Sequence, residues 1–279
     1  MNILSAMVPE VSHAKHCLRA LVVDDNPVNR EVARRMLEKR GHLVVTVGDG
    51  AQGLFEWQKG VYDLILMDLH MPVLDGPATT RQIRELEKTR GGHVPIIALT
   101  ANVIRGTEKE CLSAGMDAYI TKPLQRDYFI KTTEHTVEKV RARVANQQQA
   151  VAFTIPAAPS PEVAVSEERL ICMEYMAELV GHDVELQQKI LHLCVEALSA
   201  KIPLYNRAMR KGDHKVLKQL AHYLRGSLGM LGLPTLVKIG EEIENDYDTL
   251  GDKVWQQRCE QFRTILYRLN EELRQFHAA

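Results

Sequence analysis

Hydrophobic residues in the first half of the chain gather in short runs that alternate with longer amphipathic segments. The runs have the length of β-strands and lie at 18–23, 43–47, 64–68, 95–100 and 118–120. The segments between and after them have the length of helices, at roughly 26–40, 49–59, 76–88, 107–114 and 125–144. Unbroken apolar runs are typical of strands buried on both faces of a parallel sheet. The alternation therefore predicts an α/β fold, a (βα)5 doubly wound parallel sheet.

The hydrophobic pattern changes twice after this half. Residues 145–166 show neither a helical nor a strand period and are rich in Gln, Pro and Ala, which is typical of a semi-flexible tether. Only helical periods follow, at roughly 168–180, 183–211, 214–231, 234–247 and 253–276. Pro203 lies inside the second of these segments, and we expect it to kink or break that helix.

The last predicted helix indicates how the C-terminal part packs. Its apolar residues are spaced 4, 3, 4, 3 and 4 apart and are Trp255, Cys259, Phe262, Leu266, Leu269 and Leu273. This spacing is typical of antiparallel helix bundles. We therefore expect a flexible extension at 1–17, an α/β domain at 18–144, a linker at 145–166 and an all-α helical-bundle domain at 167–279.

Composition narrows the possible functions. The 279 residues suffice for two domains, each with its own core. Lys plus Arg is 35 and Asp plus Glu is 36, so no excess of charge favours binding to nucleic acid or to an anionic membrane. No apolar run approaches the ~18 residues of a membrane span, and the N-terminus lacks the pattern of a signal peptide. Five widely spaced cysteines without a CxxC pair indicate reduced thiols, which predicts a cytoplasmic protein.

Polar residues stand at the ends of the predicted strands. Asp24 and Asp25 end the first strand, and Asp68 ends the third. Thr100 ends the fourth strand, and Lys122 follows the fifth. A single Asp at a strand end is as easily a loop or capping residue. The carboxyl ends of parallel strands, however, meet at one crevice, where open α/β sheets bind their ligands.

Three carboxylates in one crevice restrict what the crevice can hold. Two carboxylates about 4 Å apart repel by roughly 4 kcal/mol at an effective dielectric near 20, so a group of three raises its own pKa values or binds a cation. An all-oxygen site with room for water and phosphate oxygens suits Mg²⁺. The Lys122 ammonium and the Thr100 hydroxyl would supply further contacts to a transferred phosphoryl group.

The polar residues of this half also match a known set of motifs. In chain order the set is Asp24-Asp25, Asp68, Met71-Pro72, Asp75-Gly76, Thr100-Ala101 and Lys122-Pro123. On these residues the half resembles a response-regulator receiver domain, which has a flavodoxin-like fold. The resemblance implies that Asp68 is the phosphoryl acceptor.

The same resemblance assigns a metal site. It implies Mg²⁺ held by Asp25, Asp68 and the backbone carbonyl of His70, with Asp24 assisting through water. The side chains of His70 and Asn102 occupy positions that tune dephosphorylation in the family. A receiver of this kind would catalyse its own phosphoryl acceptance and a slow autodephosphorylation.

Further expectations concern switching and an enzymatic alternative. The resemblance implies that Thr100 and Tyr119 form the pair that reports phosphorylation, and that the peptide between Lys122 and Pro123 is cis. The strongest alternative of the enzyme class is a metal-dependent phosphohydrolase with an aspartyl nucleophile. That mechanism usually needs a second acid two residues further on, where this chain has His70.

One histidine of the second half has an unusual setting. At 100° per residue, His222 lies opposite the apolar positions Leu217 and Leu220 of its predicted helix, so we expect it to face out of the bundle. Lys218 and Arg225 lie on the same strip of the helix as His222. These cations would disfavour protonation of the imidazole, leave a neutral nucleophile and attract an incoming phosphate.

Two glycines continue that strip of the helix. Gly226 and Gly229 have no side chain, and glycine within a helix costs up to about 1 kcal/mol relative to alanine. We therefore expect that their placement clears space for another protein to approach His222.

The residues around His222 carry a second resemblance. The segment 221–227, Ala-His-Tyr-Leu-Arg-Gly-Ser, together with Leu231-Gly232 is similar to the signature of a histidine phosphotransfer (HPt) domain. The resemblance implies a four-helix bundle in which His222 carries the phosphoryl group. This chain departs from the family at Arg225, where Lys is usual, and a planar guanidinium could change the rate or the choice of partner.

Together the two halves indicate a phosphorelay protein. Neither half contains a glycine-rich nucleotide motif, which predicts a separate sensor histidine kinase as donor, or a chain that resembles the C-terminal part of a hybrid sensor kinase. Asp68 would accept the phosphoryl group and exchange it with His222, and a separate response regulator or HPt protein would receive it. No small-molecule substrate beyond the phosphodonor is expected. A tether of 22 residues reaches roughly 25 Å, which permits exchange within one chain without requiring it.

Two further functions compete with the phosphorelay. In the first, phosphorylation of Asp68 is a binding switch for the helical half, and His222 never carries phosphate. In the second, the helical half binds DNA, but its balanced charge disfavours this.

The first half is also expected to carry a docking surface for partner proteins. We expect this surface around Asn29 and Val32 and at the Pro123-Leu124 pair.

Overall fold

Strands and helices alternate through the first half of the chain in the computed structural model, which describes residues 16–101, 107–146, 170–245 and 250–278. In chain order the elements are β1 (Arg19–Val23), α1 (Pro27–Lys39), β2 (Leu43–Val47), α2 (Gly50–Lys59), β3 (Leu64–Asp68), α3 (Gly76–Arg90), β4 (Ile96–Thr100), α4 (Thr107–Ala114), β5 (Ala118–Thr121) and α5 (Arg126–Asn146). Each lies within a few residues of the segment that the hydrophobic pattern predicts.

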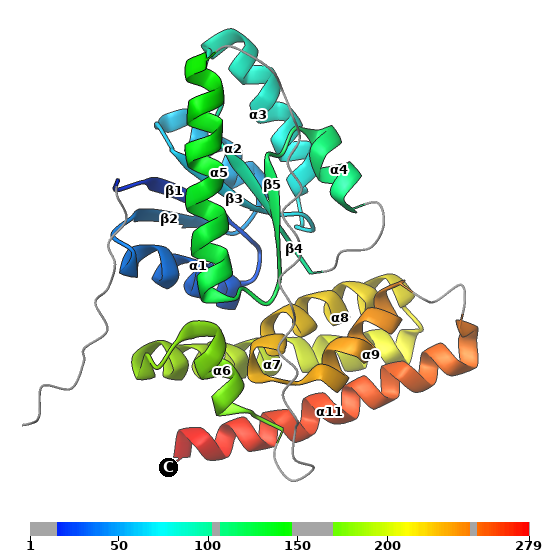
Figure 1. The fold of residues 1–279 in the computed structure, drawn as a ribbon. Coiled ribbons are helices and arrows are strands. Elements are labelled where there is room, and N and C mark those ends of the chain that lie inside the picture. Colours follow the sequence, from blue (N-terminus) through cyan, green and yellow to red (C-terminus); the bar gives the residue numbers. More distant parts are fainter. Residues whose placement is uncertain (1–15, 102–106, 147–169, 246–249, 279) are drawn as a thin grey trace, which may run out of the picture.

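The five strands form one parallel sheet in the order β2-β1-β3-β4-β5. Helices α1 and α5 cover one face, and α2, α3 and α4 cover the other (Figure 1). Every residue of β3 and β4 is buried, as expected for central strands. The predicted doubly wound sheet is confirmed. Its topological switch point lies between β1 and β3, the place where such sheets bind ligands.

Capping residues start the helices next to the carboxyl edge of the sheet. Asn26 caps α1 by accepting a hydrogen bond from the amide of Val28, and Pro27 occupies the first turn, where its missing amide costs no hydrogen bond. Asp75 caps α3 in the same way. These caps fix where each loop ends and its helix begins.

The described part of the second half is helical. Its elements are α6 (Met173–Val180), α7 (Val184–Lys211), α8 (His214–Leu228), the 3-10 segment η1 (Gly229–Leu231), α9 (Pro234–Asn245) and α11 (Asp252–Ala278). The helices α7, α8, α9 and α11 pack around a common apolar core, while α6 packs on α7 and η1. All six apolar residues of α11 that show the 4-3 spacing are buried. The predicted helical bundle is confirmed.

Two details of the bundle differ from the prediction. Helix α7 runs through Pro203, so the break expected there does not occur. The proline ring removes one backbone hydrogen bond, but Ile202 and Tyr205 on either side of it are buried in the core and keep the helix in place. The helix expected over 214–231 ends one turn early, because its last turn is the 3-10 segment η1.

Helix α1 lies between the sheet and the bundle (Figure 1). One buried apolar cluster extends from the α1 side of the sheet, through Val28 and Val32, to the interior of the bundle. Val32 and Leu124, which were expected to lie on a docking surface, are both 0% exposed. The carboxyl edge of the sheet faces α8 of the bundle, because residues in the loops after β1 and β3 contact that helix.

Two predicted segments fall mostly outside the described residues, namely the extension at 1–17 and the linker at 145–166. Among the helices that the structure describes, none combines the length and the apolar character needed to cross a membrane.

Candidate functional site

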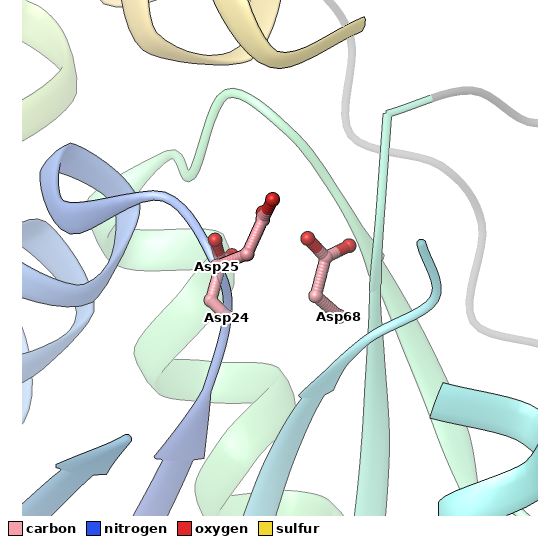
Figure 2. A group of neighbouring side chains, drawn as sticks. All are labelled: Asp24, Asp25 and Asp68. Carbon is pink, nitrogen blue, oxygen red and sulfur yellow. The ribbon is translucent and has the colours of Figure 1, made fainter. Parts of the chain in front are cut away.

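The sheet brings Asp24 and Asp68 to the same level. Strands β1 and β3 are parallel neighbours, with Val23 opposite Met67. The residue after each of these is an aspartate, Asp24 directly past the end of β1 and Asp68 at the end of β3, so the two carboxylates emerge together at the switch point of the sheet. Figure 2 shows them with Asp25, gathered above the ends of these strands.

The three carboxylates form a compact and largely buried cluster. Each offers an oxygen atom within 4.8 Å of the other two. Asp24 is 0% exposed and Asp68 is 3% exposed. Burial raises the pKa of Asp24 to about 6, with the Lys122 charge opposing and the Asp68 charge adding to the rise. Burial and the Asp68 charge likewise raise the pKa of Asp25. The cluster therefore holds more negative charge than its burial favours.

Lys122 lies between two of these acids. Its Nζ is 2.8 Å from Asp24 Oδ2 and 2.9 Å from Asp68 Oδ2, and its side chain is 7% exposed. Burial by itself would lower the pKa of Lys122, but the two carboxylates raise it above its ordinary value. One ammonium against three carboxylates leaves a net negative site.

The donor set of this cluster suits a hard divalent cation. It consists of carboxylate oxygens without histidine or cysteine ligands, which is the chemistry that Mg²⁺ prefers. The net negative charge gives such a cation a favourable electrostatic environment. That the backbone carbonyl of His70 is a further ligand of Mg²⁺ stays a prediction.

The loop after β3 folds closely over the strand end. The amide of Gly76 donates to the carbonyl of Leu69 at 3.0 Å. A Cβ atom at Gly76 would lie 2.1 Å from the carbonyl oxygen of Asp68, so a side chain cannot fit there. Steric exclusion of a side chain therefore explains why the Asp75-Gly76 motif has glycine at this position.

The remaining polar residues of the receiver-like motif lie on β4 and β5. Thr100 ends β4, one residue past the strand partner of Asp68, and is 5% exposed. Tyr119 on β5 is buried in an apolar cluster with Cys111, and this burial raises the pKa of its phenol. The switch role of Thr100 and Tyr119 stays a prediction, and Asn102 lies outside the described residues.

The backbone around Lys122 bears out one expectation. The Lys122–Pro123 peptide bond is cis, and the Lys122 amide donates to the Thr100 carbonyl. The hydrogen bond joins the residue after β5 to the last residue of β4.

His222 faces away from the bundle core, as its helical period predicts. Its side chain is nevertheless only 18% exposed, and its Nδ1 lies 2.7 Å from Oε1 of Glu244 on α9. Burial by itself would raise the pKa of Glu244, but hydrogen bonds and charges from His222 and Arg225 lower it to about 2. Because an ionised carboxylate only accepts hydrogen bonds, Nδ1 carries a hydrogen and donates a hydrogen bond to Glu244.

Glu244 also pairs with Arg225, which was expected to be a cation available to an incoming phosphate. The guanidinium donates through Nε at 2.9 Å and Nη2 at 2.7 Å to Oε2 of Glu244, and its side chain is 5% exposed. It also reaches the carbonyl of Ala101 in the α/β half at 3.5 Å. Arg225 is therefore not the bare cation beside His222 that the sequence suggests. Lys218 lies on the same helix and is partly exposed.

The two glycines of the expected open strip differ in their surroundings. A Cβ atom at Gly226 would lie 3.6 Å from Nδ2 of Asn26, so Gly226 faces α1 of the other half. Gly229 is buried, and a Cβ atom there would lie 3.5 Å from Val237 on α9. The expectation for Gly229 is wrong, because α8 ends at Leu228 and the 3-10 turn redirects the chain into the bundle.

The acid cluster and His222 face each other. The imidazole of His222 lies 5.3 Å from that of His70, two residues past Asp68, with the ring planes at 85°. Nearby, Nδ2 of Asn26 donates to Oγ of Ser227 at 2.6 Å. Both contacts join loops at the carboxyl edge of the sheet to α8.

Sequence reasoning missed Glu244 and the hydroxyl of Ser227. Ser227 lies in the HPt-like segment, yet nothing in the segment showed that its hydroxyl accepts a hydrogen bond from α1. Glu241 and Glu244 are three residues apart on one helix face, and both pair with Arg225. Two acids with this spacing are a signal for a cation partner, but a single sequence does not show which helix provides it.

Comparison with known proteins finds a domain family for each half of the chain. Residues 20–134 match the response regulator receiver domain family, and residues 189–278 match the Hpt domain family. The sensory/regulatory protein RpfC of Xanthomonas campestris is 28% identical over 277 residues, which cover 98% of this chain and 36% of RpfC. The sensor histidine kinase GacS of Pseudomonas protegens is 29% identical over 233 residues, which cover 82% of this chain and 24% of GacS. The chain thus spans about a third or less of these relatives.

A solved structure similar to the first half is the receiver domain of sensor histidine kinase PA1611 from Pseudomonas aeruginosa. It is 42% identical and covers 44% of this chain and 99% of that chain, with a TM-score of 0.41. A magnesium ion is coordinated in the active site cleft of that protein. On the matches to both domain families, the chain carries a response regulator receiver domain followed by an Hpt domain, the modules of two-component phosphorelay signalling.

Proposed function

We propose that this chain is a phosphorelay intermediate in which Asp68 accepts a phosphoryl group and exchanges it with His222. The presence of both a receiver and an Hpt domain fits a phosphorelay role. The observation that carries the proposal is the contact between His222 and His70, since His70 follows Asp68 in the loop at the acid cluster. Exchange within one chain is the simplest consequence of that contact.

The first step is acceptance of the phosphoryl group on Asp68. An oxygen of the Asp68 carboxylate attacks the phosphorus of the donor, a new O–P bond forms, and the donor leaves with the electron pair of the broken bond. Lys122 supports this step, because its ammonium already lies 2.9 Å from Asp68 and can neutralise charge on the phosphoryl oxygens. Thr100 contributes a hydroxyl at the neighbouring strand end.

Asp24, Asp25 and Asp68 are the residues that would hold Mg²⁺, together with the backbone carbonyl of His70. The fit rests on three clustered carboxylates with a single ammonium between them. When bound, the cation neutralises the negative charge of the acids and of the phosphoryl oxygens. The Lys122 side chain supplies a fixed positive charge with or without the cation.

The second step is exchange with His222. Nδ1 keeps its hydrogen and donates a hydrogen bond to Glu244, so the neutral imidazole has its lone pair on Nε2, which attacks phosphorus as the O–P bond to Asp68 breaks. The electron pair of that bond returns to the Asp68 carboxylate. The reverse sequence moves the group from His222 to Asp68, so the same geometry serves either direction. Glu244 positions the imidazole throughout.

The proposed partners follow from the two acceptors. A sensor histidine kinase would supply the phosphoryl group to Asp68, and a separate response regulator or HPt protein would exchange it afterwards. The names of the relatives RpfC and GacS describe sensory proteins, of which this chain matches only a part. Slow autodephosphorylation of Asp68 would limit the lifetime of the signal.

Phosphoryl mapping tests this proposal. The wild type, Asp68→Asn and His222→Gln are incubated with acetyl phosphate and Mg²⁺, and the products are followed by intact mass and by their lability in acid and base. Phosphohistidine in the wild type that disappears in Asp68→Asn supports exchange through Asp68. The variant His192→Gln is the matched control, because His192 is a largely exposed histidine on α7.

The same experiment separates the alternative of a binding switch. In that case Asp68 alone becomes modified, and no phosphate that is labile in acid but stable in base forms in any variant. His222 would then act only in contacts between the two domains. Absence of modification on Asp68 in the wild type, with and without Mg²⁺, would overturn the proposal as a whole.

A further inference from the structure

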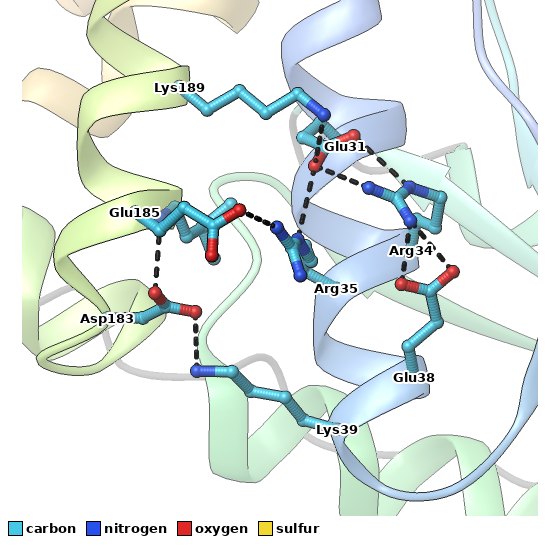
Figure 3. A network of polar contacts seen from close by, with 9 residues as sticks. Glu31, Arg34, Arg35, Glu38, Lys39, Asp183, Glu185 and Lys189 are labelled. Carbon is cyan, nitrogen blue, oxygen red and sulfur yellow. Dashed lines mark hydrogen bonds and ion pairs between the residues drawn. The ribbon is translucent and has the colours of Figure 1, made fainter.

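Three ion pairs join α1 of the receiver domain to the start of α7 in the Hpt domain (Figure 3). The pairs and their distances are Lys39–Asp183 at 2.6 Å, Arg35–Glu185 at 2.7 Å and Lys189–Glu31 at 2.9 Å. None of these residues belongs to the acid cluster or to the surroundings of His222. We call these six residues the α1–α7 charge surface.

The charges on the two helices are complementary in their order. Along α1 the order is acid, base, base at residues four apart, so the three side chains share one face of the helix. On α7 the residues that face them run in the opposite direction along the chain, in the order base, acid, acid. Every position of the surface therefore sets unlike charges against each other.

Contacts within each domain hold parts of this surface in place. Glu31 also pairs with Arg34 on the same helix at 2.7 Å and is 10% exposed. Asp183 caps α7 by accepting a hydrogen bond from the amide of Leu186, and its hydrogen bond to Lys39 lowers its pKa. Side chains that are already ordered lose less conformational entropy when the domains dock.

We propose that the α1–α7 charge surface selects the chain's own Hpt domain as the docking partner of its receiver domain. The inference rests on the proposed exchange between Asp68 and His222 and adds which partner is favoured. A foreign Hpt domain with another order of charges at these positions would set like charges against α1, which disfavours the wrong partner more than it strengthens the right one. Attachment to the same chain adds a high effective concentration.

The apolar contact alone does not make this distinction. The buried cluster that passes through Val28 and Val32 supplies area, but apolar area is not specific for one partner. The charged pairs lie beside that cluster and can only form in one register of α1 against α7. Selection therefore depends on the charges, and it weakens with rising salt.

The test exchanges charges within each helix of the full-length chain. The α1 exchange combines Glu31→Arg with Arg35→Glu, and the α7 exchange combines Glu185→Lys with Lys189→Glu. Each exchange leaves the net charge of the chain unchanged, so long-range attraction is not altered. Asp183 is left in place because it caps α7.

The first measurement is the rate at which phosphohistidine forms within one chain at low salt. Exposed ion pairs are individually weak, so either exchange alone should slow the transfer about three- to tenfold. Both exchanges in the same chain restore the opposite charges and should restore the rate. The combined variant keeps the disturbance within α1, so recovery isolates the contact between domains. Near 1 M salt, where the Debye length is about 3 Å, the differences should disappear.

The second measurement concerns the choice of partner between chains. A donor chain carries His222→Gln and an acceptor chain carries Asp68→Asn, so only transfer between chains is seen. A donor with the α1 exchange and an acceptor with the α7 exchange each lose their internal match but match one another. This pair should be the fastest of the four combinations.

The outcomes separate this inference from the proposed function. If phosphohistidine forms at equal rates in all variants, the selection by charge is overturned while the exchange itself stands. If the unaltered chain forms no phosphohistidine, the proposed exchange fails, and small-angle scattering of the unphosphorylated chain decides on docking. An unchanged radius of gyration in the α1-exchanged chain then overturns the inference. A dimer joined through this surface would assign it to a second copy and overturn it as well.

Discussion

The acid cluster of the receiver domain and the histidine site of the Hpt domain are built in different ways. Asp24 and Asp68 come from neighbouring strands, and the parallel register of β1 and β3 fixes their relative height. His222 and Glu244 come from two helices of a bundle, and their contact depends on how α8 and α9 are rotated against each other. In the sheet the backbone hydrogen bonds set the geometry, whereas in the bundle side-chain packing sets it.

The two sites also differ in their balance of charge. The acid cluster keeps excess negative charge, and burial, with a smaller addition from the Asp68 charge, raises the pKa of Asp24 to about 6. At the histidine site the carboxylate of Glu244 pairs with the Arg225 guanidinium and accepts a hydrogen bond from His222, and its pKa is lowered to about 2 despite its burial. The first site is therefore prepared to take up a cation, and the second is already neutralised internally.

Removal of the Lys122 ammonium from the acid cluster should have the largest effect on stability. Lys122→Met leaves buried carboxylates without their partner, and breaking a buried ion pair in this way costs about 3–5 kcal/mol. Urea unfolding followed by Trp57 fluorescence in a Trp255→Phe background would measure the loss in the receiver domain. Millimolar Mg²⁺ should recover part of it.

The matched control for this change is Lys131→Met. Lys131 is exposed on α5, so its replacement should alter the free energy of unfolding by less than about 0.5 kcal/mol. Equal stability of Lys122→Met and the reference protein would show that the acids do not depend on the ammonium.

Acid should destabilise the Hpt domain through Glu244. The pKa of this carboxyl is lowered from 4.5 to about 2 on folding, so its contribution is complete above pH 4.5 and is lost as the pH falls toward 2. A difference of this size corresponds to at most about 3 kcal/mol. Unfolding of a Trp57→Phe variant, followed by the buried Trp255, would show a steeper loss with falling pH than the same protein with Glu244→Gln. Parallel pH profiles would contradict the assignment.

The contrast between a sheet set by backbone hydrogen bonds and a bundle set by side-chain packing explains what the sequence could predict. The strands lie close to their predicted positions because each is an apolar run that ends in a polar residue, and the sheet order then brings Asp68 and Asp24 together. The helical period correctly placed His222 outside the bundle core. It could not predict Glu244 or His70 beside it, because these contacts depend on helix rotation and on the docking of another domain. Continuation of α7 through Pro203 was missed for the same reason, since packing outweighs the local preference.

A smaller effect is expected on the transfer step itself. Glu244→Gln keeps an acceptor for Nδ1 of His222 but removes the charge, and hydrogen bonds to charged groups are worth about 1.5–3 kcal/mol. Formation of phosphohistidine should therefore slow by about tenfold or more, and its pH dependence should shift, while phosphorylation of Asp68 continues. Glu241→Gln on the same helix is the control, because it removes the other carboxylate that pairs with Arg225 and leaves Glu244 in place. An unaltered pH profile in Glu244→Gln would leave Glu244 without a positioning role.

The smallest effect is expected at Gly226, where the two domains meet. A Cβ atom there would lie 3.6 Å from Nδ2 of Asn26, which is ordinary van der Waals contact, so Gly226→Ala should fit the docked structure. Alanine in place of a helical glycine should stabilise the Hpt domain by about 0.4–1 kcal/mol, and transfer within the chain should change little. Thermal unfolding and the rate of phosphohistidine formation would measure both, with Gly226→Leu as the contrasting variant that obstructs docking. If alanine already blocks the transfer, the two domains must approach more closely during exchange than they do in the docked structure, and the contact between His70 and His222 would be a resting arrangement.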